Sequence, residues 1–67
     1  MFDSFSLQFD DTAVFDLAIQ QAERNFHSIY FDVSYSDRLI TFDDKDAFNR
    51  FKNHCKNENW YFVENNN

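Results

Sequence analysis

Two pairs of adjacent aspartates are the residues of this chain best suited to chemistry. Each pair follows a phenylalanine, and a fifth aspartate lies close behind the second pair. The five residues are Asp10, Asp11, Asp43, Asp44 and Asp46. Carboxylates in such positions cap helix N-termini, bind hard cations or contact the Lys and Arg side chains of a partner. The spacing lacks the Asp-x-Asp-x-Asp-Gly pattern of calcium loops, so we predict no metal and no cofactor.

The surroundings of the two aspartate pairs repeat along the chain. Residues 9–15 recur as residues 42–48, and apolar residues outside these segments match at the same offset of 33 positions. Each copy reads as a strand, an aspartate pair, an amphipathic helix and a second strand. A pseudo-repeat over 5–34 and 38–64 therefore predicts a single domain over 1–67 with the ferredoxin-like β-α-β-β-α-β topology. This α+β fold is a two-layer sandwich of a four-stranded antiparallel sheet with two helices on one face.

The hydrophobic periodicity gives the expected bounds of these elements. Alternation at period two predicts strands over 4–9, 28–35, 39–42 and 60–63, and residues 65–67 read as a frayed tail. Helical stripes predict helices near 11–25 and 44–57, with Phe15, Phe48 and Phe51 as core anchors. The strand residues expected to face the helices are Phe5, Leu7, Phe9, Ile29, Phe31, Val33, Ile40, Phe42, Trp60 and Phe62. A split α+β arrangement with another strand order is the alternative, against which the repeat argues.

The position of the aspartates in this fold predicts a binding surface. We expect the first and third strands to be central and parallel, which brings both strand-to-helix turns to one end of the sheet. The five aspartates then converge there. Two caps need only two carboxylates, and like charges this close repel one another. A basic partner that relieves the repulsion explains the surplus.

The sheet face without helices is a second candidate surface. It is expected to carry Ser4, Ser6, Gln8, Tyr30, Asp32, Ser34, Leu39, Thr41, Tyr61 and Val63. Among these, Tyr30, Leu39 and Tyr61 are apolar enough to bind a partner or a second copy of the chain. Scattered surface apolarity is the alternative interpretation. RNA-recognition domains of similar topology place a base-stacking aromatic on the first strand, where this chain has Ser6 and Gln8.

The composition narrows the class of function. Twelve acidic against six basic residues give a net charge of −6, which disfavours direct binding of nucleic acid and favours a basic protein surface. A single cysteine and no long apolar run predict a cytoplasmic protein that neither spans a membrane nor forms an internal disulfide.

Enzyme chemistry finds little support in the sequence. Acylphosphatases share the topology but use a Gly-rich anion loop, and this chain has no glycine. His54 and Cys55 are adjacent, so on a helix they point about 100° apart and cannot readily share a metal. His27 lies at a helix-to-strand junction, and Cys55 lies on the apolar stripe, where a buried thiol is expected. We therefore predict a protein that is not an enzyme.

The overall make-up resembles the small acidic accessory proteins of tailed bacteriophages, which include host-takeover factors and anti-restriction or anti-CRISPR inhibitors. The likeness lies in the size, the charge, the Phe/Asp/Asn-rich and Gly-free composition, and the strand-to-helix segment 39–52. The resemblance implies a stoichiometric binder that modulates or inhibits a larger host protein. Proteins that handle nucleic acid are one class of such targets. The alternative is a dimeric small-ligand or regulatory module. Binding that weakens steeply with salt distinguishes the first from the second.

Overall fold

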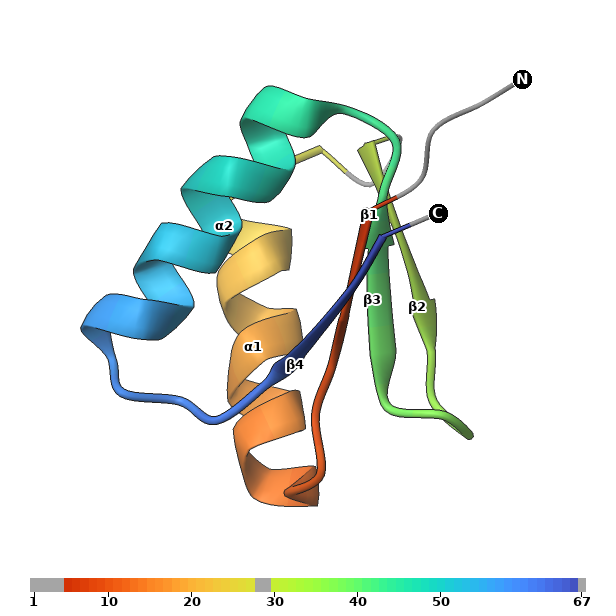
Figure 1. Cartoon of the computed structure of the whole chain (residues 1–67), viewed down its shortest axis with the longest axis vertical. Helices are drawn as coiled ribbons and strands as arrows, with labels where there is room; N and C mark the ends of the chain where they lie inside the picture. Colours follow the sequence, from red (N-terminus) through yellow and green to blue (C-terminus); the bar gives the residue numbers. More distant parts are fainter. Residues whose placement is uncertain (1–4, 28–29, 67) are drawn as a thin grey trace.

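The computed structural model describes residues 5–27 and 30–66 and has the predicted order of elements (Figure 1). In chain order these are β1 (Phe5–Gln8), α1 (Thr12–Asn25), β2 (Phe31–Ser34), β3 (Leu39–Phe42), α2 (Lys45–Asn57) and β4 (Val63–Asn66). The strands form one antiparallel sheet in the order β2-β3-β1-β4, and both helices cover the same face of it. The α+β two-layer fold, consistent with a ferredoxin-like sandwich, is thereby confirmed.

The two central strands run antiparallel, whereas the sequence analysis expected them to be parallel. Phe5 pairs with Phe42 and Gln8 with Leu39, so β1 and β3 point in opposite directions. The reason lies in how the halves interleave. Each half is a β-α-β unit with two parallel strands, and one strand of the other half fills the gap between them. A pseudo-twofold axis perpendicular to the sheet relates such halves, and it reverses strand direction.

The core between helices and sheet is built largely from phenylalanine. The three predicted anchors are 2%, 2% and 1% exposed, which confirms both helical stripes. They are Phe15, Phe48 and Phe51. The rings of Phe42 and Phe51 lie 5.2 Å apart, and those of Phe5 and Phe48 lie 5.3 Å apart, within the range of favourable aromatic pairs. Burial on this scale is what allows so short a chain to keep a core.

The last strand begins three residues later than predicted. The backbone N–H of Trp60 donates to the Cys55 carbonyl, and Asn59 has a left-handed φ of 60°, so the end of α2 uses residues expected in a strand. β4 is Val63–Asn66, and Asn65 pairs with Ser6 rather than belonging to a frayed tail. Trp60 and Phe62 precede the strand but still pack against the core. The predictions for Ser4, Ile29 and Asn67 lie outside the described residues.

Candidate functional site

The direction of β3 separates the two aspartate pairs, so the predicted convergence of five carboxylates is wrong. β1 ends at one end of the sheet, where α1 begins, and β3 ends at the opposite end, where α2 begins (Figure 1). Asp10 and Asp11 thus lie at one end of the sheet. Asp43, Asp44 and Asp46 lie at the other. The error follows directly from treating the two central strands as parallel.

At the first end, the turn after β1 lies beside the turn between β2 and β3. The N–H of Phe9 donates to the Arg38 carbonyl at 2.9 Å, and the Arg38 Nε donates to the Phe9 carbonyl at 3.0 Å. The Gln8 side chain donates to the Asp37 carbonyl at 3.4 Å. These bonds fix the two turns against each other. We name the resulting surface the hairpin end, made of Asp10, Asp11, Tyr35, Asp37 and Arg38.

The hairpin end presents three exposed carboxylates. The Oδ1 of Asp11 accepts from the N–H groups of Ala13 and Val14 at 2.8 and 3.2 Å and caps α1. The Oδ2 of Asp37 accepts from the Ser34 hydroxyl at 3.3 Å. Asp10 makes no hydrogen bond or ion pair with any other described residue. Capping thus accounts for one of the three carboxylates.

An exposed tyrosine stands among these carboxylates. Tyr35 is 71% exposed, and its ring meets the ring of Phe15 edge-on with centroids 6.1 Å apart. One edge of the tyrosine is therefore anchored to the core while the rest stays open to solvent. Sequence reasoning missed Tyr35 and Asp37 as site residues. A prediction of antiparallel central strands would have identified them, because the start of β3 then lies beside the end of β1.

The second aspartate turn has a different environment. The Oδ2 of Asp44 accepts from the Ala47 N–H at 2.9 Å and caps α2, as the first turn caps α1. Asp44 and Asp46 also line a cavity of about 430 Å³, together with Tyr30 and Arg50. A cation is thus part of the same surface as the carboxylates.

The three apolar residues predicted on the open sheet face do not form one surface. Tyr30 lines the cavity beside Asp44 and Asp46. Leu39 is half-buried on β3, in register with Gln8 and Ser34. Tyr61 is 66% exposed but lies before β4, outside the sheet. The expected patch of Tyr30, Leu39 and Tyr61 is therefore wrong as a single patch.

The open face of the sheet is mostly polar. The Ser6 and Thr41 hydroxyls, on neighbouring strands, are hydrogen-bonded at 2.8 Å. In register with them lie Asp32 on β2 and Asn65 on β4. Apolar side chains in this face are confined to the row that contains Leu39 and Val63. A homodimer through this face would bury little apolar area, which argues against the predicted dimer.

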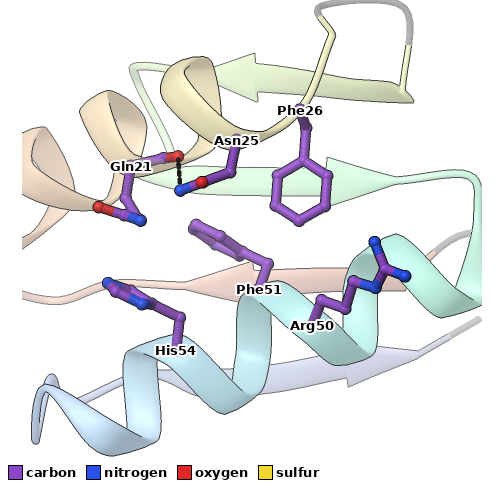
Figure 2. A pocket seen from close by; sticks show the side chains of 6 residues that line it. All are labelled: Gln21, Asn25, Phe26, Arg50, Phe51 and His54. Atoms are coloured by element: carbon purple, nitrogen blue, oxygen red, sulfur yellow. Dashed lines mark hydrogen bonds between the residues drawn. The ribbon is translucent and has the colours of Figure 1, made fainter.

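A second cavity, of about 270 Å³, lies between the helices (Figure 2). Its lining comes from the end of α1 and the middle of α2. The residues are Gln21, Asn25, Phe26, Arg50, Phe51 and His54. Asn25, Phe26 and Arg50 line both cavities, so the two adjoin. We name the pair the interhelical groove. The sequence analysis did not single out Arg50, and no local motif marks it.

Cys55 lies in the core, and His54 lies beside Trp60 and Glu58. Burial raises the pKa of the Cys55 thiol to about 12, which suppresses the thiolate that nucleophilic chemistry needs. The His54 ring packs edge-on against Trp60 at 5.6 Å, and its Nε2 lies 3.9 Å from the Glu58 carboxylate. Within residues 5–27 and 30–66, no three His, Cys, Asp or Glu side chains are grouped to hold a metal ion.

No protein-family model, curated protein or solved structure matches this chain. In the part of the chain that the structure describes, neither helix is long and apolar enough to cross a membrane. The surfaces described above are therefore the basis on which a function is inferred.

Proposed function

We propose that this chain is a non-enzymatic interaction module that binds a basic surface of a larger protein and modulates that protein. The contact is made at the hairpin end. The observation that carries the proposal is the hydrogen-bonded junction of two turns, which presents Asp10, Asp11 and Asp37 together. Arg38 is the cation closest in sequence to these carboxylates, and its Nε is bonded to the Phe9 carbonyl.

The carboxylates and the tyrosine contribute in different ways. Exposed ion pairs are each worth about 0.2–1 kcal/mol, so three carboxylates alone give modest affinity. Their larger effect is on the rate of association, since a negative patch steers a positive surface toward it. Tyr35 supplies the apolar contact, because an exposed tyrosine anchored at one edge loses little conformational freedom when it is covered. Charge therefore speeds the encounter and the ring slows dissociation.

The charge of the whole chain supports the same interpretation. The chain has twelve acidic and six basic residues, and the resulting net charge of −6 repels phosphate backbones and attracts basic proteins. The resemblance to phage accessory proteins adds that the partner is a host protein, which stays a prediction. Each surface contains an arginine, but Arg38 is bonded to the Phe9 carbonyl, whereas Arg50 makes no bond to another described residue and can neutralise Asp44 and Asp46. The hairpin end is therefore preferred over the second aspartate turn.

The test compares two doubly substituted variants that remove equal charge. Asp10→Asn with Asp37→Asn alters the hairpin end and leaves the Asp11 cap in place. Asp43→Asn with Asp46→Asn is the matched control, which leaves the Asp44 cap. Each immobilised protein is exposed to a lysate of the organism that produces it, at low and high salt, and captured proteins are identified by mass spectrometry. The captured protein is then purified for binding kinetics.

Support requires that the wild type and the control capture the same protein and that salt releases it. The hairpin-end variant must bind that protein with a roughly tenfold slower association rate and a similar dissociation rate. Tyr35→Ala should mainly raise the dissociation rate. Equal kinetics for both double variants would place the contact elsewhere, and salt-independent binding would exclude a charge-steered interaction.

A further inference from the structure

We propose that the interhelical groove is a binding site for a small planar monocarboxylate. The groove lies between the helices, away from the hairpin end, so this inference does not depend on the proposed partner. It is carried by three observations. The groove has aromatic walls, it contains an arginine without a partner among the described residues, and carboxylates line one end of it.

The aromatic part of the groove comes from both helices. Phe26, the residue at the C-terminal cap of α1, meets Phe51 of α2 edge-on with centroids 6.4 Å apart. Phe51 is 1% exposed, so it forms a fixed floor, whereas Phe26 is half-buried. Phe26 also contacts Phe42 of the sheet at 5.4 Å, which holds its ring in place. A flat apolar ligand can therefore pack against the exposed part of the Phe26 ring, which the buried Phe42 and Phe51 rings hold in place.

Arg50 lies where the two cavities adjoin. It is exposed, lines both of them, and makes no hydrogen bond or ion pair with any other described residue. Figure 2 shows its side chain extending from α2 at the end of the groove beyond Phe26, on the side away from Gln21 and His54. A guanidinium group binds a carboxylate through two parallel N–H···O bonds, which is the strongest pairing open to a planar anion.

Amide groups lie on the side of Phe51 opposite to Arg50. The Asn25 Nδ2 donates to the Gln21 carbonyl at 3.0 Å, which fixes the Asn25 side chain along α1. The Gln21 amide and the His54 ring face one another across the groove (Figure 2). These groups supply further polar contacts for a small ligand. Cavities of about 270 and 430 Å³ fall near the lower limit for ligand pockets, roughly 300–1,000 Å³.

The charges at the other end of the groove select among anions. Asp44 and Asp46 line the same cavity as Arg50, so a group with two negative charges meets two carboxylates and one guanidinium. Repulsion therefore disfavours phosphate esters relative to a carboxylate with a single charge. A neutral aromatic ligand gains the rings but not the arginine. A planar monocarboxylate fits all three features.

The experiment is a titration followed by ¹H–¹⁵N NMR, which observes the Gln21 and Asn25 side-chain amides and the Arg50 Nε directly. The probes are benzoate, phenyl phosphate and benzyl alcohol, which share a ring and differ in charge. Arg50→Gln tests the guanidinium. Lys56→Gln is the matched control, because it removes an exposed charge from the same helix without touching the groove.

We expect saturable benzoate shifts at Gln21, Asn25 and Arg50, with a dissociation constant in the millimolar range or below. Arg50→Gln should weaken benzoate binding about tenfold or more, and Lys56→Gln should not change it. Phenyl phosphate should bind more weakly than benzoate. The proposal is overturned if benzoate causes no saturable shift, or if the Arg50→Gln variant binds benzoate as tightly as the wild type does. It is also overturned if the wild type binds benzyl alcohol as tightly as benzoate, or phenyl phosphate more tightly than benzoate.

Discussion

The turn from β1 into α1 and the turn from β3 into α2 carry the same aspartate pair but have different neighbours. Each uses its second aspartate, Asp11 or Asp44, to cap the helix that follows. The first turn is bonded to the β2–β3 hairpin and is joined by Asp37 and Tyr35. The second borders the interhelical groove and shares it with Arg50.

This difference shows which properties a repeated unit retains. Capping and core packing depend on positions within one half of the chain, and both are the same in the two halves. The surroundings of each turn depend on the strand directions of the whole sheet, and there the halves diverge. Identical motifs therefore fix similar local structure but not similar surfaces. The predictions below compare equivalent residues of the two halves.

The largest expected effect is the loss of a core ring. Phe15 and Phe48 are equivalent in the repeat and equally buried, so each change to Ala should lower the free energy of unfolding by about 3–5 kcal/mol. Urea denaturation measures both variants, and Leu17→Ala, at a half-exposed position of α1, is the control. If either change to Ala unfolds the domain, the milder Phe→Leu change at the same two positions gives the comparison of the halves. A wild-type midpoint for either variant would contradict the equivalence of the halves.

The second effect depends on pH and belongs to one half only. Cys55 occupies the position that Ala22 holds in the first half, and both are fully buried. The folded thiol has a pKa of about 12, above its ordinary value of 9.0, so between these values the unfolded chain loses a proton that the folded chain keeps. Stability is therefore complete below pH 9 and falls above it, by up to about 1.4 kcal/mol per pH unit.

Urea denaturation at pH 8, 9 and 10 tests this slope, and Cys55→Ala should remove the thiol's share of it even though the variant is less stable at every pH. Tyr and Lys titrate in the same range, which is why the slopes and not the absolute values are compared. A slope shared by the wild type and Cys55→Ala would assign the pH dependence to those residues.

The third effect is the loss of a helix cap. Asp11→Ala and Asp44→Ala should each cost about 1 kcal/mol, since each removes an acceptor from free N–H groups of a helix. The matched controls are Asp10→Ala and Asp43→Ala, whose side chains cap neither helix. Thermal or urea denaturation of the four variants should separate them into two groups. Loss of stability in Asp10→Ala equal to that in Asp11→Ala would mean that both carboxylates support the turn.

The smallest effect concerns an ion pair in the second half. The Lys52 Nζ lies 3.3 Å from the Glu64 carboxylate, joining α2 to β4 on the helix-covered side of the sheet. A double-mutant cycle of Lys52→Met and Glu64→Gln should give a coupling of about 0.2–1 kcal/mol that shrinks in high salt. A coupling of zero would show that this ion pair does not contribute to the free energy of unfolding.

Much of this fold could be predicted from the sequence because the repeat and the helical stripes are local signals. Phe15, Phe48, Phe51 and the two caps follow from spacing within a few turns of helix. The start of β4 could not be predicted, because it depends on how many residues the end of α2 consumes, and Asn59 has a left-handed backbone there without being glycine. Asn65 was predicted to lie in a frayed tail because a polar residue gives no hydrophobic alternation that would indicate its pairing with Ser6.

The candidate surfaces were less predictable than the fold. One incorrect strand direction moved Asp43, Asp44 and Asp46 to the wrong end of the molecule and left Asp37 and Tyr35 unconsidered. The groove around Arg50 requires the packing distance between two helices, and no spacing within one helix encodes that distance. The residues of a surface site come from several elements, so an error in one element changes the whole site.

The pairing of β4 with β1 has a consequence for the way the protein is made. Residues 63–66 bond to residues 5–8, so the central strand β1 gains its second neighbour only after residues 63–66 have been synthesised. Before residues 63–66 have been synthesised, β1 has an open edge and carries Phe5 and Leu7, a surface onto which another nascent chain can add a strand. Productive folding on the ribosome must therefore wait for Val63–Asn66, and a truncation before this segment should yield aggregates rather than a smaller domain.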